Sequence, residues 1–249
     1  MFSIFKNYPG LFVSFSKKID GSMKLTDNPN LKDKIFQNRN DYFEKINIDP
    51  QKIISAEIVH GNEARIVKLK DSGNIIIGAD GLITKDKNIY SSITSADCLP
   101  IFLFDLKKEI LGVVHAGWRS LEMDILANAV GKIVELGGNP KNILAGIGPA
   151  ICPKHYEVGL EVANKFAKYP NAIKKVSLGL IRRERENDKY LLDIKKVAQL
   201  QLLKSGLSEK NIEISSECTF ELPEKYFSAR RDKKKEIEAM IAVIGMKSL

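Results

Sequence analysis

Apolar stretches of strand length recur along the chain, separated by short polar segments. LPIFLFD at 99–105 is a nearly continuous apolar run, and KKEILGVVHA at 107–116 follows it after one turn, so we predict two neighbouring buried strands. ISAEIVH (54–60) and ARIVKL (64–69) predict two strands paired around a His-Gly-Asn turn. Further strands are expected within 74–84, 91–94, 142–149, 213–220 and 238–246.

A helical spacing of apolar residues begins after this central strand pair. From Arg119 to Leu136 the apolar residues recur three and four positions apart, which predicts one amphipathic helix that ends at a Gly-Gly pair. Residues 157–168 and 192–205 also predict helices. Because strands and helices mix without a strict strand–helix–strand order, we expect a mixed α/β (α+β) fold of layered mixed sheets and helices.

The length and composition are those of a globular domain. The chain has 249 residues, 44% of them hydrophobic, and no repeat or flexible linker divides it, so we expect a single domain over residues 1–249. It has no run of 18 apolar residues and no signal-peptide pattern at its start, which predicts a cytoplasmic protein without membrane contact. Three cysteines do not suggest a disulfide framework.

The chain is basic, with a formal net charge of +8. Two dense runs, RRER at 182–185 and RRDKKK at 230–235, are interpreted as solvated surface. A nucleic-acid interface would interleave aromatic residues with such a basic face, and only Tyr226 and Phe227 precede the second run. We therefore expect no nucleic-acid partner, and we keep a non-catalytic basic module for nucleic acid or protein as an alternative of another class.

Two histidines and one cysteine stand where predicted strands end. They are His60 in VHGN, His115 in VHAGW and Cys98 in TSADCLP. Nitrogen and sulfur donors suit zinc, and catalytic zinc sites use three protein ligands with water as the fourth. The separations of 38 and 17 residues are too long for a zinc finger and indicate a site assembled from distant strand ends. Asp97, beside Cys98, is expected to orient a ligand.

Other interpretations of these positions stay open. Histidines at strand ends are often structural, and Cys98 with His115 could instead form a nucleophile–base pair. Cys152 and His155 could supply a fourth metal ligand, which would close the site. Trp118 could stack on a base or anchor the core.

Longer motifs indicate a family. VHGN, GADGLITK, TSADCLPIFLFD, VVHAGWRS, GIGPAICPKHYEVG, YLLDIKKVAQLQLLKSG and ECTF with YFSARRD occur in the order typical of YfiH-type proteins, and the chain resembles that family over nearly its whole length. The family has been labelled laccase-domain or polyphenol oxidase, and more recently purine nucleoside phosphorylase. The resemblance implies a zinc enzyme of one mixed α/β domain, with His60, Cys98 and His115 as metal ligands.

The implied chemistry is phosphorolysis of adenosine, inosine, guanosine and methylthioadenosine, with adenosine deaminase activity as well. Nucleosides and phosphate would be the partners of a monomer or small homo-oligomer. Arginines bind phosphate through paired hydrogen bonds, so Arg119, Arg230 and Arg231 are candidate phosphate ligands, with pairing of one of them to Asp232 or Asp97 as the competing expectation. Asn62 could bind ligand or close its turn.

A second enzymatic alternative keeps the fold and changes the substrate. Some YfiH-type proteins are described as peptidoglycan editing hydrolases, which remove L-serine from a nucleotide-linked muramyl precursor, and Cys98 would then be the nucleophile. A four-copper laccase is excluded, because it needs a three-copper cluster of histidines and only His155 remains after His60 and His115. Copper binding would be adventitious.

The chain departs from the family pattern at positions that bear on substrate range more than on the metal. A Gly-Arg pair is missing after SARRD, and single residues differ from the usual glutamine, tyrosine, glycine and cysteine at Ile58, Ala229, Ser120 and His155.

Overall fold

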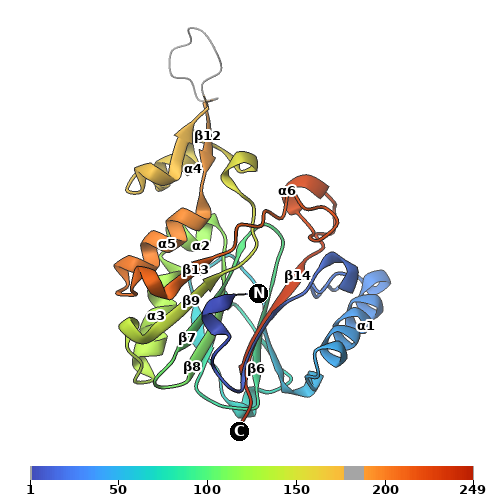
Figure 1. Cartoon of the computed structure of the whole chain (residues 1–249). Helices are drawn as coiled ribbons and strands as arrows, with labels where there is room; N and C mark the ends of the chain where they lie inside the picture. The colour runs from blue at the N-terminus through green and yellow to red at the C-terminus, as the bar shows by residue number, and fades with distance from the viewer. Residues whose placement is uncertain (1, 177–187, 249) are drawn as a thin grey trace.

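The protein is arranged in four layers. The computed structural model describes residues 2–176 and 188–248, in which a six-stranded and a five-stranded sheet pack face to face with helices on their outer faces (Figure 1). The expected mixed α/β fold of layered sheets and helices is confirmed. The basic run at 182–185 lies outside the described residues.

The six-stranded sheet contains the two strands predicted within 99–116. They pair antiparallel, with Leu99 opposite Ala116, and every residue in both is buried. The strand order is β13-β9-β7-β8-β5-β3. The strands are β3 (Ala64–Ile66), β5 (Gly81–Thr84), β7 (Leu99–Asp105), β8 (Ile110–Ala116), β9 (Ile143–Ile147) and β13 (Ile212–Ile214).

The five-stranded sheet has the order β1-β14-β6-β2-β4. Its strands are β1 (Leu11–Phe15), β2 (Ile53–Ala56), β4 (Ile75–Ile76), β6 (Tyr90–Ser95) and β14 (Met240–Met246). The expected hairpin of 54–60 with 64–69 is therefore wrong, because β2 belongs to this sheet and β3 to the other. The chain between them crosses from one sheet to the other, and His60 takes a left-handed conformation (φ 59°) in that crossing.

Helices cover both outer faces. The six-stranded sheet is covered by α2 (Trp118–Glu122), α3 (Ile125–Glu135) and α5 (Ile194–Lys204), and the five-stranded sheet by α1 (Pro29–Lys45). A small sheet of β10 (Glu157–Gly159), β11 (Ile173–Lys175) and β12 (Lys189–Leu192) extends beyond the layers with α4 (Leu160–Lys165), and α6 (Ala229–Asp232) lies near it (Figure 1). None of these helices has the length and apolarity needed to cross a bilayer.

Three expected elements are interrupted. The single helix expected over 119–136 is two helices, because Asp124 takes a left-handed conformation (φ 57°) that a right-handed helix cannot contain. The helix expected over 157–168 starts as strand β10. The strand expected over 213–220 ends at Ile214, and Cys218 makes only an isolated bridge with Ala150.

Successive side chains of β7 point alternately into two different hydrophobic cores. Phe102 and Phe104 point into the core between the sheets, whereas Ile101 and Leu103 point into the core under α3 and α5. Since β7 and β8 are anchored on both faces, the residues at their ends are held by a rigid support.

The turn after β7 depends on the buried Asp105. Its carboxylate accepts hydrogen bonds from the backbone N–H groups of Lys107, Lys108 and Asn139 at 2.9, 2.9 and 2.7 Å. Asp105→Ala leaves three donors unpaired, so we expect the free energy of unfolding to fall by about 2–4 kcal/mol in urea denaturation. Lys107→Ala removes only an exposed side chain and should change it by less than about 0.5 kcal/mol. Equal losses in the two variants would contradict this role of Asp105.

Candidate metal site and its surroundings

The structure brings His60, Cys98 and His115 together at one end of the two sheets. One donor atom from each residue lies within 4.8 Å of the others. Cys98 directly precedes β7 and His115 is near the end of β8, so the antiparallel pairing of these strands sets them side by side. His60 comes from the crossing after β2, and its ring meets that of His115 edge to face, with centroids 4.8 Å apart. The cluster is buried at His115 and exposed at His60.

Asp80, which sequence reasoning did not select, holds two of the three residues. It is fully buried just before β5, and its carboxylate accepts a hydrogen bond from the backbone N–H of His60 (2.9 Å) and contacts His115 Nδ1 (2.9 Å). The N–H groups of Gly61 (2.7 Å) and Val59 (3.3 Å) also donate to it. With Nδ1 of His115 committed to Asp80, Nε2 is the nitrogen left for a metal.

The position of Asp80 in the GADG motif was its only sequence signal. A polar residue between small residues ahead of a buried strand is also typical of a plain turn, so the motif alone does not separate the two roles. Its function becomes visible only through contacts with residues about 20 and 35 positions away.

Asp97 orients neither histidine, so the expectation for this residue is corrected. Its carboxylate accepts hydrogen bonds from Thr219 Oγ1 (2.6 Å), Ser228 Oγ (2.9 Å) and the backbone N–H of Arg230 (2.7 Å). Asp97 takes a left-handed conformation (φ 81°), and its carboxylate bonds the segment 219–230 instead of the cluster. The orienting role expected of Asp97 belongs to Asp80.

Gly117 leaves the space that the three donors share. A Cβ built on Gly117 would lie 2.9 Å from Cys98 Sγ, 3.3 Å from His60 Cδ2 and 3.8 Å from His115 Cε1. The residue has φ −82° and ψ 174°, which any amino acid can adopt, so the glycine is required by space and not by backbone conformation.

Cys98 and His115 each shift the pKa of the other toward its charged form. Burial acts to raise the pKa of the Cys98 thiol, but His115 and His60 outweigh it and lower that pKa to about 6. Burial acts to lower the pKa of His115, but the Cys98 thiolate and Asp80 raise it to about 9. A thiolate facing an imidazolium is therefore the favoured state at neutral pH.

The donor set fits a zinc ion. Zinc prefers thiolate and imidazole ligands in a tetrahedral arrangement, with bonds of about 2.0–2.3 Å. Here two ring nitrogens and a thiolate converge within 4.8 Å, next to a residue without a side chain. A divalent cation would also replace the proton on His115 as the countercharge of the thiolate.

Tyr156, which the sequence pattern did not single out, is subject to the charge of Cys98. Burial raises its pKa, the charge of Cys98 raises it further, and Arg230 and Arg119 act in the opposite direction. The guanidinium of Arg230 lies over the Tyr156 ring, 5.1 Å from its centroid, and donates to the carbonyl of Glu157 (2.8 Å). Tyr156 is thus a neutral hydroxyl on which both arginines and Cys98 act electrostatically.

The three candidate phosphate arginines have different surroundings. Arg119 is exposed, and its guanidinium covers the Trp118 ring at 4.3 Å. Arg231 is used by the fold: its guanidinium donates to Asp232 and to the carbonyls of Thr219, Phe220 and Tyr226. Arg119 and Arg230 therefore remain candidate phosphate ligands. Arg231 instead pairs with Asp232, which was the competing expectation.

Two further sequence candidates contact protein. Asn62 donates from its side chain to the carbonyl of Met123 (3.1 Å), which ties the crossing to the α2–α3 connection. Trp118 is half-buried and packs against the core under α3 and α5.

Cys152 and His155 are not ligands of the first cluster. They form a group of their own with Glu221, whose donor atoms also lie within 4.8 Å of one another. Burial and the neighbouring Cys218 raise the pKa of Cys152 to about 11. The idea of a fourth ligand that closes the first site is therefore replaced by a second, separate group.

Gly117→Ala should weaken zinc binding without unfolding the protein. The new methyl group would push Cys98 and His60 apart, and we expect zinc affinity to fall about tenfold or more, measured by competition with a chelating dye. Gly159→Ala is the matched control, because Gly159 also precedes a helix with φ −77° and ψ 170° and has no atom near its added Cβ. Equal affinities in both variants would rule out the steric argument.

The pH dependence of alkylation in zinc-free protein should reveal the thiolate of Cys98 paired with the imidazolium of His115. Because a thiolate forms above its pKa, iodoacetamide should modify Cys98 at a rate that rises around pH 6, while Cys152 stays slow up to pH 8. His115→Asn should raise the Cys98 midpoint above that of the wild type, since burial remains and the larger of the two histidine contributions is lost. Peptide mass spectrometry separates the two thiols. A Cys98 midpoint near 9 in the wild type would contradict the pair.

Comparisons with known proteins agree with this architecture. A family described as "Multi-copper polyphenol oxidoreductase laccase" matches residues 13–247. Purine nucleoside phosphorylase YlmD of Bacillus subtilis is 33% identical over 86% of this chain and 77% of its own. Purine nucleoside phosphorylase YfiH of Escherichia coli is 34% identical over 83% and 78%.

A solved structure extends the similarity to three dimensions. The crystal structure of YlmD from Geobacillus stearothermophilus superimposes with a TM-score of 0.86 at 27% identity, over 99% of this chain and 94% of that one. The chain therefore belongs to the family described as multi-copper polyphenol oxidoreductase laccase, together with the YfiH and YlmD proteins.

Proposed function

We propose that this protein is a zinc-dependent purine nucleoside phosphorylase that acts on adenosine, inosine, guanosine and methylthioadenosine, with adenosine deaminase as a side activity. The observation that carries the proposal is the convergence of His60, Cys98 and His115 in a chain whose relatives are named purine nucleoside phosphorylases. We take residues 1–249 as one enzyme domain. Its three free cysteines fit the proposed cytoplasmic location.

His60, Cys98 and His115 would hold the zinc, with Asp80 fixing His115 and the His60 backbone. A bound zinc supplies Lewis acidity and lowers the pKa of water. The copper in the family's description does not extend to a four-copper centre here, because the chain has three histidines in all and His155 belongs to the separate group.

Arg119 and Arg230 are the proposed phosphate ligands. Both act electrostatically on Tyr156, as Cys98 does, and this shared influence supports a role for their charges near the cluster. An anion bound between them would be held against the anomeric carbon of the nucleoside. Arg119 is exposed in the first turn of α2, so it can turn from Trp118 toward a ligand.

Phosphorolysis then needs one bond to form and one to break. A phosphate oxygen bonds to the anomeric carbon while the bond from that carbon to the purine nitrogen breaks, through an oxocarbenium-like transition state. The electron pair leaves with the purine, which takes up a proton originating from hydrogen phosphate. Tyr156, kept neutral by its raised pKa, is the proposed hydrogen-bond donor that steadies the leaving base.

The low pKa of Cys98 favours one second candidate. A thiolate beside an imidazolium is the pairing of a cysteine nucleophile, which would suit hydrolysis of L-serine from a nucleotide-linked muramyl precursor. Zinc quantification separates the two functions, because a ligated Cys98 is not free to attack a substrate.

The test is phosphate-dependent release of base. Zinc-loaded protein should release adenine from adenosine and hypoxanthine from inosine only with phosphate present, followed by liquid chromatography. Cys98→Ser and His115→Ala should each lose one zinc equivalent and about 100-fold or more in kcat/KM. Arg230→Ala should raise the KM for phosphate, whereas Arg65→Ala, an exposed arginine in β3, should not.

Two results would reject the proposal. Zinc-loaded protein that releases no base at any phosphate concentration is not a phosphorylase. Release of L-serine from the muramyl precursor without nucleoside turnover would make Cys98 a nucleophile.

A further inference from the structure

We propose that Cys152, His155 and Glu221 form a second divalent-cation site of the zinc class, independent of the His60–Cys98–His115 cluster. A thiol sulfur, an imidazole nitrogen and a carboxylate oxygen lie within 4.8 Å of one another in this group. Sulfur, nitrogen and oxygen donors in one set favour zinc over calcium or magnesium, which prefer oxygen ligands. This second group plays no part in the proposed phosphorylase chemistry.

The spacing of the donors is close to that of a zinc ligand set. Tetrahedral zinc, with bonds of about 2.0–2.3 Å, holds neighbouring ligand atoms roughly 3.5 Å apart. His155 Nε2 and Glu221 Oε1 are already 3.1 Å apart. Small side-chain rotations would therefore bring all three donors to a common ion.

Two segments distant in the sequence hold the group in place. Cys152 directly precedes a short 3-10 turn, Pro153–His155, which ends at His155. Glu221 lies 66 residues after His155. The isolated bridge of Ala150 with Cys218 aligns the segments, and the backbone N–H of Cys152 donates to Cys218 Sγ (3.2 Å). These contacts do not need a cation, so the donors are arranged in advance.

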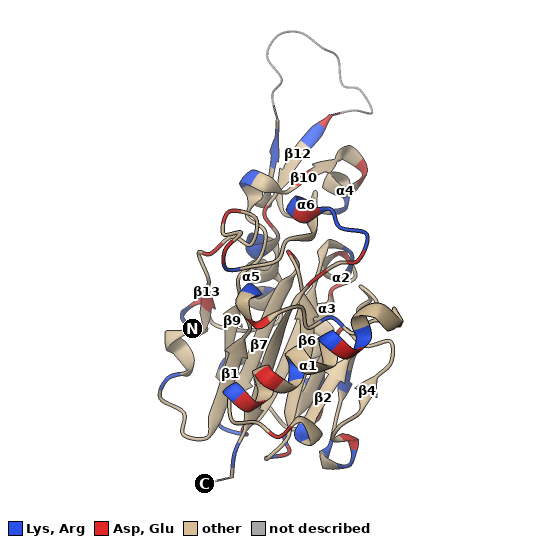
Figure 2. Cartoon of the chain, turned by 90° about the vertical axis from the view of Figure 1, so that its right-hand side faces the viewer, with Lys and Arg blue, Asp and Glu red and all other residues tan. Residues whose placement is uncertain are grey.

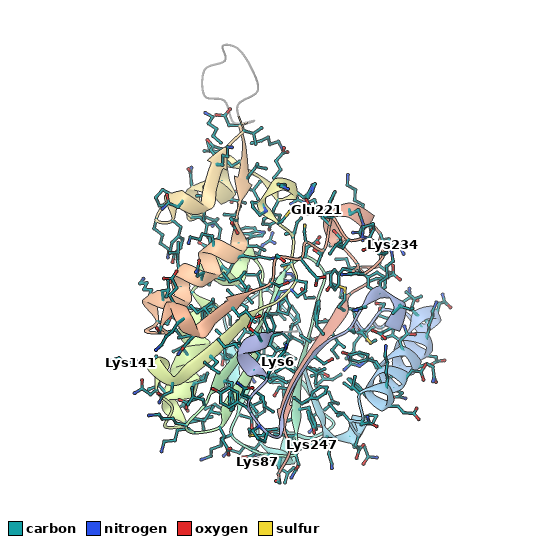
Figure 3. All side chains as sticks on the ribbon, in the orientation of Figure 1. Lys6, Lys87, Lys141, Glu221, Lys234 and Lys247 are labelled. Atoms are coloured by element: carbon teal, nitrogen blue, oxygen red, sulfur yellow. The ribbon has the colours of Figure 1, made fainter. Side chains whose placement is uncertain are left out.

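Stacking fixes the histidine ring. His155 lies on Phe220, with ring centroids 4.3 Å apart and planes 12° from parallel, and this orientation places Nε2 at Glu221. The neighbouring cation, Lys154, is 3.8 Å from Glu221 but 80% exposed, so it can swing into water when an ion binds. Figure 3 shows Glu221 at the end of the molecule where α6 lies.

The group is open enough for an ion to enter. The side chains of His155 and Glu221 are 31% and 43% exposed, so water can supply a fourth ligand. Cys218 is buried next to Cys152 and lies outside the set of three converging donors. A plain ion pair between His155 and Glu221 would involve two of the residues and would not account for the third donor, the thiol of Cys152, within 4.8 Å of both.

A cation here would join two segments that flank the first cluster. The turn that carries His155 leads directly to Tyr156, and the segment with Glu221 is held by Arg231 through the carbonyls of Thr219 and Phe220. The ion would act as a structural clamp, and its loss should lower the midpoint of thermal unfolding more than it changes base release.

The test uses Co²⁺ as the probe in the Cys98→Ser variant, with a non-thiol reductant present. Any thiolate-to-cobalt charge-transfer band must then come from Cys152 or Cys218. We expect the Cys98→Ser protein to bind one equivalent of Co²⁺ with this band. Adding Cys152→Ser should abolish the band completely. Adding His155→Ala or Glu221→Gln should lower the affinity for Co²⁺ at least tenfold. Glu224→Gln, an exposed carboxylate on the same segment, is the matched control and should bind normally.

The His155→Ala and Glu221→Gln variants keep the test valid if Cys152→Ser misfolds. His155 and Glu221 are partly exposed, so their substitution should leave the circular dichroism spectrum unchanged even if Cys152→Ser does not fold. Retention of the band in Cys98→Ser/Cys218→Ser supports Cys152 as the sulfur donor. Absence of a thiolate band in Cys98→Ser, or a band insensitive to His155→Ala and Glu221→Gln, overturns the proposal. Base release by His155→Ala with Cys98 intact reports on the phosphorylase separately.

Discussion

One buried carboxylate, that of Asp80, holds the candidate metal cluster together. A fully buried charge is costly unless each of its hydrogen-bonding positions is filled. Here the turn around His60 and the ring of His115 fill them, and the backbone carbonyl of Asp80 also accepts the N–H of His115 (2.7 Å). Neither histidine can move away without removing one of the hydrogen-bond partners of this carboxylate. The geometry of both donors therefore follows from the position of one residue before β5.

The pairing of strands in the six-stranded sheet positions the third donor, Cys98. Cys98 makes no contact with Asp80, and it reaches the cluster because β7 and β8 pair in a fixed register, with Pro100 opposite His115. Side chains of β7 are buried in a core on each face, so this register cannot slip without exposing one of them. The donors thus have unequal support: His115 is fixed by its strand and by the carboxylate, Cys98 by its strand, and His60 by the carboxylate and by the Asn62 contact of its crossing. Exchange of a cation should begin at His60, the exposed donor.

The sequence predicted several strands and the three donor residues, but it did not predict how the strands pair or where one helix is interrupted. Continuous apolar runs predicted β7, β8 and β14, because a strand buried on both faces needs apolar residues throughout. The three donors could be selected because strand ends gather functional groups. The pairing of β2 with β3 was wrong, since a local apolar pattern does not indicate which sheet a strand joins. Periodicity also could not reveal the break at Asp124, a left-handed residue between two helices with apolar faces.

Adjacent residues differ in role both at Asp97 and Cys98 and in the basic run 230–235 that Asp97 contacts. Asp97 was expected to orient a ligand, and it binds Ser228 and the N–H of Arg230 instead. In the next position Arg231 supports the fold, while the lysines that follow are exposed. Figure 2 shows basic and acidic residues interspersed along the ribbon. Asp97 is also the residue before Cys98. The carboxylate thus links the backbone that presents the thiolate to the segment that presents Arg230, so an anion that shifts Arg230 would be felt at Cys98 through one hydrogen-bonded residue.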